Sequence, residues 1–334
     1  METPSYETKV QQQIEQYRHV ANMHELPEIF HYWSNKYLRP KLNALFGVDS
    51  IVDFYAEYFR RATVGQPGPY RFASLGAGEC SLEIQLAVRL RAQGLSDFTI
   101  ECFELSPVLI ERALVAARQA DVTDLVQIVP VDLNQWSPTK GCYTGIMASH
   151  SLHHLVELEQ IFSSCHKSLK PTGVFVTNDM IGRNGHMRWP EVLTWVESIW
   201  RFLPDRLKYN RQLNCFDAEF VNRDCSQESF EGVRAQDILP LLIRRFGFTH
   251  FLAYGGLIDV FIDRGYGHNF APNNEKDAAL IDFIETLNAS LLAQGCIKPT
   301  MMFAVMSPDL AASCRYDQVL SPAFSERKPE MVTI

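Results

Sequence analysis

The sequence lacks the features that mark several classes of protein. It has no Cys-x-x-Cys pair among its eight cysteines, several of which fall inside expected strands or helices, so we expect reduced thiols. No apolar run approaches the length of a membrane span, and the polar residues 1–16 are unlike a secretion signal. Basic residues form no stripe, and the formal net charge is −8. These absences argue against a membrane protein and a nucleic-acid-binding protein, and they predict a cytoplasmic location.

The composition that remains is that of a globular protein, with 46% apolar and 21% charged residues in a chain of 334. This length is enough for one large α/β domain with additions. The clearest boundary is residues 63–70, which hold two glycines and two prolines. We therefore expect a helical lid over residues 1–65, a main domain over 66–312 with a substrate-covering insertion over 180–235, and a loosely ordered tail over 313–334.

Short apolar runs alternate with helical patterns after this boundary. The expected strands are residues 72–75, 99–103, 126–130, 145–148, 173–177, 248–254 and 301–306. The expected helices are residues 81–91, 107–118, 156–169, 190–202 and 235–246, with a further helical region up to residue 292. This alternation favours right-handed crossovers and a doubly wound, mainly parallel sheet that helices cover on both faces.

The most informative segment is the turn that joins the first expected strand to its helix. It is built on Gly76 and Gly78, and Glu104 and Asp132 stand at or just after the ends of the next two strands. Glycines let a backbone pass close beneath a ligand, and a carboxylate at a strand end can accept hydrogen bonds from both hydroxyls of a ribose. A dinucleotide fingerprint would need a glycine at position 81, where this chain has Ser81, which disfavours a nicotinamide-dependent dehydrogenase. The pattern predicts a pocket for a smaller nucleoside cofactor, S-adenosylmethionine.

Five motifs together resemble the class I S-adenosylmethionine-dependent methyltransferases. They are Leu75-Gly-Ala-Gly78, Phe103-Glu104-Leu-Ser106, Val131-Asp132-Leu133, Ser151-Leu-His-His154-Leu155 and Leu169-Lys-Pro-Thr-Gly173. The resemblance implies a doubly wound seven-stranded sheet with an antiparallel final strand, and S-adenosylmethionine as the cofactor. Ser74 departs from the family pattern because an acid is usual there, and Cys80 departs because a third glycine is usual. The cofactor contacts that the resemblance implies are Gly76, Ala77, Gly78, Glu104, Leu105, Asp132, Leu133 and Ser149.

Three further segments, residues 179–189, 230–239 and 254–256, resemble a bacterial small-molecule branch of this family. In that branch a helical N-terminus and an insertion after the fifth strand cover the pocket. The resemblance therefore implies methyl transfer to a small molecule in a biosynthetic pathway. The charge balance agrees, and the Asn/Asp-Pro-Pro-aromatic and Pro-Cys motifs of nucleobase methylation are absent. We expect a small-molecule partner, no nucleic acid and no membrane, and the sequence leaves a homo-oligomer open.

Methyl transfer is a displacement at a sulfonium carbon, so the enzyme must align the acceptor and exclude water. A base is needed only for an acceptor that carries a proton. The leading acid/base candidate is His186, because Gly185 and polar neighbours indicate an exposed loop, and His153 and His154 are further candidates. Each of the three could equally be a structural residue. We expect no metal, because no carboxylate stands at a suitable helical spacing from the histidines.

Arginine and aromatic residues supply candidates for binding the substrate. Two arginines of the insertion could hold a carboxylate in a bidentate grip, or could pair with Glu191 or Glu197 on the neighbouring helix. Aromatic residues near the N-terminus could cover the methionine end of the cofactor as a cation–π wall, or could simply pack. The substrate candidates are Tyr32, Trp33, Arg183, Arg188 and Trp189, and Tyr37 is a candidate for binding the cofactor.

Two other functions remain open on the sequence. On the same fold, the amino group of S-adenosylmethionine could attack its own side-chain carbon, giving azetidine-2-carboxylate and methylthioadenosine, which needs a closed aromatic pocket and no acceptor site. The departures at Ser74 and Cys80 could instead mark a silent binding module, although Glu104 and Asp132 are retained. Methyl transfer is the leading hypothesis. The sequence does not name the acceptor atom, because this fold serves oxygen, nitrogen, carbon and sulfur acceptors.

Overall fold

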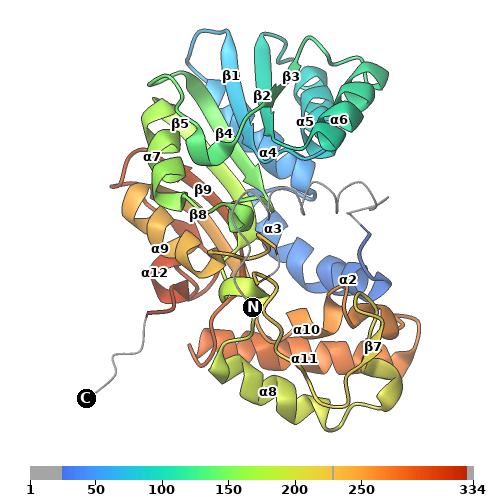
Figure 1. Ribbon diagram of the computed structural model, residues 1–334. Helices are drawn as coiled ribbons and strands as arrows, with labels where there is room; N and C mark the ends of the chain where they lie inside the picture. The colour runs from blue at the N-terminus through green and yellow to red at the C-terminus, as the bar shows by residue number, and fades with distance from the viewer. Residues whose placement is uncertain (1–24, 228, 329–334) are drawn as a thin grey trace.

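A computed structural model describes residues 25–227 and 229–328 of the chain. An eight-stranded sheet lies in the upper part of the molecule, with strand order β10-β8-β9-β5-β4-β1-β2-β3 (Figure 1). β9 pairs antiparallel with β5 and β8, and the other pairs of this sheet are parallel. The strands are β1 (Tyr70–Leu75), β2 (Phe98–Glu104), β3 (Val126–Pro130), β4 (Tyr143–Ser149), β5 (Leu169–Met180), β8 (Gly247–Tyr254), β9 (Met301–Ser307) and β10 (Arg315–Tyr316). The predicted doubly wound, mainly parallel sheet is confirmed, and the two-residue β10 adds an eighth strand to the seven expected.

Helices cover both faces of this sheet, as its sequence predicts. On one face lie α4 (Ile51–Thr63), α5 (Ser81–Ala92) and α6 (Pro107–Gln119), and on the other lie α7 (Leu158–Ser168) and α9 (Ala235–Arg245) (Figure 1). The central strand β4 is buried along almost its whole length, which explains its near-continuous apolar sequence. The parallel strands end at one edge of the sheet, and the loops that follow them bring the candidate site together there.

α4 belongs to the core of the sheet, although the sequence places it in the predicted lid of residues 1–65. Its first turn is capped by the Ser50 side chain, which accepts a hydrogen bond from the backbone N–H of Asp53. The Phe59 ring stacks on Phe72 of β1 with 4.2 Å between ring centroids. Gly145 of β4 permits this approach, because a Cβ there would lie 2.8 Å from the Phe59 ring. Residues 51–63 are therefore part of the sheet's own cover rather than a separable lid.

A second lobe of helices lies below the sheet in Figure 1 and is formed by three separate stretches of chain. One is α2 (Glu28–Trp33), which continues through a π-helical turn, η1 (Ser34–Leu38), into α3 (Arg39–Phe46). The second follows β5, as the predicted insertion over 180–235 requires. The third, between β8 and β9, was expected to continue the sheet-covering helices but packs against α2 instead. The remaining elements of the lobe are α8 (Pro190–Trp200), the β6–β7 hairpin (Tyr209–Asn210 and Cys215–Phe216), α10 (Asp259–Ile262) and α11 (Glu275–Ala293).

The predicted loose tail, residues 313–334, contains a short strand and a short helix in the part that the structure describes, residues 313–328. β10 pairs with β8, and α12 (Pro322–Ser325) packs against β8 and α9. Lys298 donates a hydrogen bond to the backbone carbonyl of Phe324, and the Arg327 guanidinium lies 2.9 Å from the carboxylate of Glu191. The part of the tail that the structure describes is therefore fastened to both lobes.

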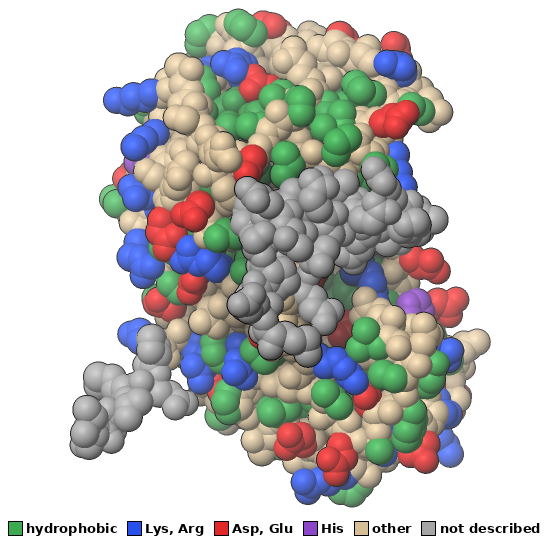
Figure 2. Space-filling view, viewed as in Figure 1, with side chains coloured by type: hydrophobic (Ala, Val, Ile, Leu, Met, Phe, Trp, Pro, Cys, Tyr) green, Lys and Arg blue, Asp and Glu red, His purple; other side chains and the backbone are tan. Residues whose placement is uncertain are grey.

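The charges on the surface and the hydrophobicity of the helices bear on whether nucleic acids or membranes are partners. Figure 2 shows Lys and Arg side chains interspersed with Asp and Glu over the face drawn, with no broad patch of one sign among the coloured residues. No helix in the described part of the chain combines the length and the hydrophobicity that a membrane crossing requires.

Candidate functional site

The glycine turn between β1 and α5 is shaped by three residues with positive φ angles. Gly76 has φ 65°, and a Cβ there would lie 2.8 Å from Cβ of Ser151, so only glycine lets the turn meet the loop after β4. Gly78 has φ 59°, and among the described residues no atom lies within 4 Å of a Cβ built on it, so these residues leave space beside its backbone. Cys80, where the family has a third glycine, adopts φ 57° all the same. The backbone of the family turn is thus kept, at a cost of roughly 1–2 kcal/mol for a non-glycine residue in this conformation.

Glu104, at the end of β2, fastens this turn to the next strand. One carboxylate oxygen accepts a hydrogen bond from the Gly78 N–H at 2.9 Å. The other accepts from the N–H groups of Leu105 at 2.8 Å and Ser106 at 2.7 Å. Burial outweighs these contacts and raises the pKa of the Glu104 carboxyl. Leu105, beside it, is 40% exposed although it is apolar. The structure therefore brings together Gly78, Glu104 and Leu105, as the sequence predicts, with an apolar surface next to the acid.

The other predicted cofactor contacts lie around this turn and are engaged within the protein. Asp132 begins the single turn η2 (Leu133–Gln135) and accepts a hydrogen bond from the Asn134 N–H at 2.9 Å. Leu133 is buried. Ala77 donates its N–H to the Phe103 carbonyl at 3.0 Å. Ser149 donates its hydroxyl to the Asn178 side chain at 2.9 Å. Their contacts with a cofactor remain predictions.

A buried carboxyl group replaces the acid that the family carries before the glycine turn. The Ser74 hydroxyl donates a hydrogen bond to Glu83 at 2.6 Å. Glu83, on the first turn of α5, is 3% exposed, and burial raises its pKa to about 7. The sequence analysis missed Glu83. The available signal was an acid at the spacing of Leu86 and Leu90, which form the buried face of the helix.

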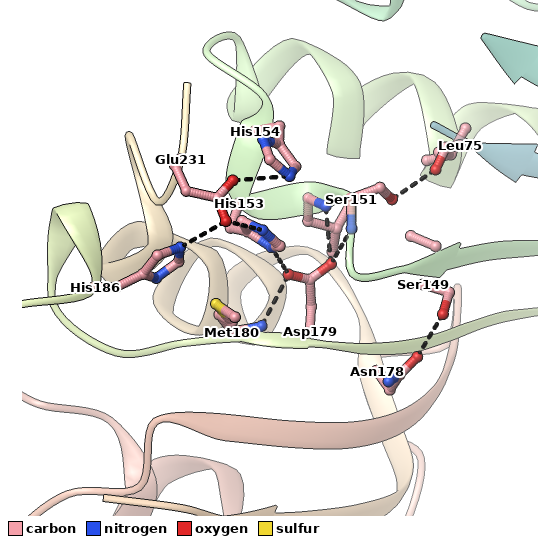
Figure 3. Close-up of polar contacts among 12 residues, drawn as sticks. Leu75, Ser149, Ser151, His153, His154, Asn178, Asp179, Met180, His186 and Glu231 are labelled. Carbon is pink, nitrogen blue, oxygen red and sulfur yellow. Dashed lines mark hydrogen bonds and ion pairs between the residues drawn. The ribbon is translucent and has the colours of Figure 1, made fainter. Parts of the chain in front are cut away.

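The three predicted acid/base histidines lie together at the ends of β4 and β5 (Figure 3). His153 and His154 are in the single turn η3 (Leu152–His154), and His186 ends the turn η4 (Asn184–His186). Asp179, at the end of β5, is fully buried and lies 2.6 Å from Nδ1 of His153. Its other carboxylate oxygen accepts hydrogen bonds from the backbone of Ser151 and Leu152, so it fixes both the turn and the imidazole. We define the histidine cluster as His153, His154, His186, Asp179 and Glu231. Asp179 is the buried residue that anchors it.

Glu231 completes the cluster from the loop before α9. Its carboxylate oxygens lie 3.3 Å from Nε2 of His154, 3.4 Å from Nε2 of His186 and 3.9 Å from Nε2 of His153, and Figure 3 shows the three rings turned toward it. Burial raises the pKa of Glu231, but the three imidazoles lower it by more, so the group is anionic at neutral pH. Burial lowers the pKa of His154 to about 4, and it also lowers that of His186. Burial lowers the pKa of His153 too, but the Asp179 carboxylate outweighs it, and the net shift is upward.

Two glycines allow the loops of His186 and Glu231 to meet. Gly185 has φ 64°, and its N–H donates to the carbonyl of Gly232 at 2.9 Å. Gly232 has φ 67°, and a Cβ there would lie 2.9 Å from Cε1 of His186. The sequence analysis did not identify Glu231 as a site residue. The segment around it was noted only as part of the family resemblance, because nothing in the spacing shows that it folds back onto His186.

The predicted arginines make contacts within the second lobe. Arg183 donates a hydrogen bond to the Arg188 carbonyl at 3.1 Å, and its guanidinium lies 5.7 Å from the centre of the Trp189 ring. The Arg188 guanidinium lies 3.3 Å from the carboxylate of Asp259. Glu191, one of the alternative partners weighed for these arginines, pairs with Arg327. The roles of Arg183, Arg188 and Trp189 in substrate binding remain predictions.

The N-terminal aromatics are anchored to α11. The hydroxyls of Tyr32 and Tyr37 donate hydrogen bonds to Asp282 at 3.0 Å and 2.7 Å. The indole N–H of Trp33 donates to Glu285 at 2.9 Å, and Trp33 is 2% exposed. In this arrangement the three side chains fasten α2 and η1 to the second lobe. Whether they cover a ligand remains a prediction.

Comparison with known proteins agrees with this geometry. Residues 75–177 match the family model of the methyltransferase domain. No match to the chain is found among curated protein sequences. The solved structures that resemble it include a putative sarcosine dimethylglycine methyltransferase from Galdieria sulphuraria, which is 14% identical, with 79% of this chain and 86% of that chain covered and a TM-score of 0.47.

Two further solved structures are similar at a comparable level. The geranyl diphosphate C-methyltransferase from Streptomyces coelicolor A3(2) is 13% identical, with 92% of this chain and 100% of that chain covered and a TM-score of 0.46. The [4+2]-cyclase SpnF is 13% identical, with 76% and 80% covered and a TM-score of 0.42. Similarity at this level says nothing of the acceptor. From the matched family model, the glycine turn and the strand order, the chain carries a class I S-adenosylmethionine-dependent methyltransferase domain at residues 75–177.

Proposed function

We propose that the chain transfers the methyl group of S-adenosylmethionine to a small-molecule acceptor. The observation that carries this proposal is the junction of Gly78 and Glu104 at the carboxyl edge of the sheet. There, the described residues leave space beside Gly78, and the apolar side chain of Leu105 is exposed next to the acid. A nucleoside needs these two surfaces, a carboxylate for the ribose and an apolar face for the base.

The residues at this edge fit the cofactor. When bound, S-adenosylmethionine supplies a methyl group on a positively charged sulfur. The Glu104 carboxylate has roughly four acceptor positions, and three backbone N–H groups occupy some of them, which leaves room for a ribose hydroxyl. Leu105 offers its exposed face to the adenine ring. Asp132 lies after the next strand, where we expect it to face the adenine amino group.

The histidine cluster is suited to activate an acceptor that carries a proton. Burial keeps His186 neutral at neutral pH, so its ring can take up a proton. Glu231, 3.4 Å away, would stabilise the imidazolium that results. Ser151 links the cluster to the cofactor side, because its hydroxyl donates to the Leu75 carbonyl at 2.6 Å and its Cβ lies against Gly76. A proton taken from the acceptor would thus be shared between Nε2 of His186 and the Glu231 carboxylate.

The acidic net charge and the mixed surface favour a small acceptor over a nucleic acid. We infer no acceptor atom from this arrangement. An imidazole–carboxylate pair would activate oxygen, nitrogen or sulfur acceptors alike, and the fold does not choose among them.

The first test is incubation of the purified protein with S-adenosylmethionine alone, followed by mass spectrometry of the nucleoside products. We expect binding without turnover, and then S-adenosylhomocysteine in step with a methylated product once panels of small acids, amines, phenols and thiols are added. Methylthioadenosine and a matching four-carbon amino acid, formed without any acceptor, would overturn methyl transfer and establish the self-cyclising alternative. Failure to bind either S-adenosylmethionine or S-adenosylhomocysteine would overturn both.

A further inference from the structure

Two imidazoles and a carboxylate of the histidine cluster converge on one point. One ligand atom each from His153, His186 and Glu231 lies within 4.8 Å of the other two. We propose that these three residues bind a divalent first-row transition metal ion, with open positions for the acceptor. This inference deepens the proposed function, because it names what activates the acceptor, and it departs from the expectation of no metal drawn from the sequence.

The three groups are slightly farther apart than the ligands of one bound ion. Ligand atoms about 2.0–2.1 Å from one ion are about 2.8–3.4 Å apart in octahedral or tetrahedral geometry. Glu231 Oε1 lies 3.4 Å from Nε2 of His186 and 3.9 Å from Nε2 of His153. Closing the group around an ion therefore needs shifts on the order of 1 Å, within the range of small rotations of the His186 and Glu231 side chains.

Neighbouring groups orient the ligands as metal sites require. Asp179 binds Nδ1 of His153 at 2.6 Å, so the lone pair of Nε2 is turned toward Glu231. The carboxylate of Glu231 is steadied on its far side by Nε2 of His154, 3.3 Å from Oε2. A histidine held by a buried carboxylate and a ligand carboxylate held by a second group are recurrent supports of bound metals. The fully buried Asp179 and the carboxylate of Glu231 also place two negative charges beside the point of convergence, which a divalent cation balances.

Nε2 of His186 is buried and lies near Glu231 without forming an aligned hydrogen bond. Among the described residues it has no aligned hydrogen-bond partner, and its approach to Glu231 is not aligned for one. The residue also adopts φ 56°, a conformation that non-glycine residues avoid, in a loop held by Gly185 and Gly232. Such strain persists where the surrounding structure enforces it, and it is concentrated at functional sites. A metal ion would satisfy this nitrogen and account for the enforced geometry.

The donor set and the position indicate the ion and its task. Two imidazoles and one carboxylate are the protein ligands of catalytic zinc sites and of non-haem iron(II) sites, both of which leave positions open. Methyl transfer involves no redox change, so the ion acts as a Lewis acid that binds the acceptor heteroatom and lowers its pKa. Ser151, two residues before His153, lies against Gly76, which places the histidine cluster beside the cofactor turn. When the ion is bound, His186 is a metal ligand and no longer the proton acceptor. The ion then activates the acceptor in place of His186.

The test measures metal binding directly on the full chain, free of any affinity tag and stripped with a chelator. We would titrate it with Co²⁺, following the visible absorption bands, and with Zn²⁺ by calorimetry. We expect one ion per chain. His154→Gln, which removes only a support of Glu231, should weaken binding by about tenfold to a hundredfold, and removing a ligand in His186→Ala or Glu231→Gln should weaken it by more than that. His268→Ala, at an exposed histidine outside the cluster, should bind as the wild type does.

The outcomes separate this inference from the proposed function. Wild-type protein that takes up no stoichiometric Co²⁺ or Zn²⁺, or variants at both His186 and Glu231 that bind as tightly as wild type, would overturn the metal site. S-adenosylhomocysteine binding, measured on the same metal-free protein, depends on Gly78 and Glu104 and should persist. Metal binding without nucleoside binding would leave the site standing and overturn the methyltransferase proposal instead.

Discussion

The two halves of the candidate site are built in different ways. The cofactor half is short-range, because Gly76, Gly78 and Glu104 belong to one strand–helix–strand unit and each stands where a parallel strand ends. The acceptor half joins His153, His186 and Glu231 from three separate loops, after β4, after β5 and before α9. A short-range site is dictated by spacing along the chain. A site made by distant loops depends on how an insertion packs, and it is free to differ between proteins that share the cofactor half.

The largest expected effect is a loss of turnover, without a loss of cofactor affinity, when the acceptor half is changed. Glu231→Gln keeps the size of the side chain and removes the charge, so it should lower kcat on any acceptor found by about 10²–10⁴-fold, the usual contribution of an activating group. S-adenosylhomocysteine affinity, measured by calorimetry, should change less than twofold. The His268→Ala variant serves as the control for both measurements. Equal losses in turnover and in nucleoside affinity would mean that the two halves are not separate.

The reciprocal change acts on the cofactor half. Glu104→Ala leaves a ribose hydroxyl and three backbone N–H groups without their acceptor, so S-adenosylhomocysteine should bind more weakly by about 1–3 kcal/mol. Metal uptake by the histidine cluster should stay at the wild-type level, which also shows that the variant is folded. An unchanged nucleoside affinity would contradict the pocket at Gly78 and Glu104.

These differences explain what could be predicted from the sequence. The mainly parallel sheet and the turn at Gly76 follow from the alternation of apolar runs and from glycines that stand directly after a strand. The Glu104 position follows from the length of one strand–helix–strand unit. The approach of Glu231 to His186 could not be predicted, because it depends on a contact between Gly185 and Gly232, whose segments have no periodic pattern.

The helices of the second lobe show the same limit. α11 has the length and apolar content of a helix that covers a sheet, and it lies between two strands of the doubly wound pattern. It packs instead against α2, where Asp282 and Glu285 accept hydrogen bonds from Tyr37 and Trp33. Long-range hydrogen bonds of this kind connect residues that are far apart in the chain, and periodicity alone gives no sign of them.

A third expected effect concerns the buried carboxyl beneath the cofactor half. The pKa of Glu83 is about 7 in the folded state and about 4.5 for an ordinary glutamate, so between these values the unfolded chain ionises while the folded chain stays protonated. The contribution of Glu83 to the free energy of unfolding is therefore greatest below about pH 4.5, and it falls as the pH rises to 7. Glu83→Gln should remove that fall and raise the free energy of unfolding at pH 8 by up to about 3 kcal/mol.

Urea unfolding of the wild type and of Glu83→Gln across pH 5–8 measures this difference. The Ser74 hydroxyl can bond to the glutamine as well, so the contact itself is kept. A constant difference between the two proteins over this range would show that Glu83 does not titrate in it. Glu83 would then be charged over this whole range, as an ordinary glutamate is, and not neutral.

The smallest expected effect tests whether η1 belongs to the cofactor half. Tyr37 is predicted from the sequence to contact the cofactor, yet its hydroxyl donates a hydrogen bond to Asp282 at 2.7 Å. Tyr37→Phe should therefore cost about 0.5–1 kcal/mol of stability, the net worth of one hydrogen bond, and change S-adenosylhomocysteine affinity less than twofold. Calorimetric titration and thermal unfolding of the same sample give both values. A loss of affinity greater than tenfold with unchanged stability would place the Tyr37 hydroxyl on the cofactor, and it would make the N-terminal helices part of the pocket instead of part of the second lobe.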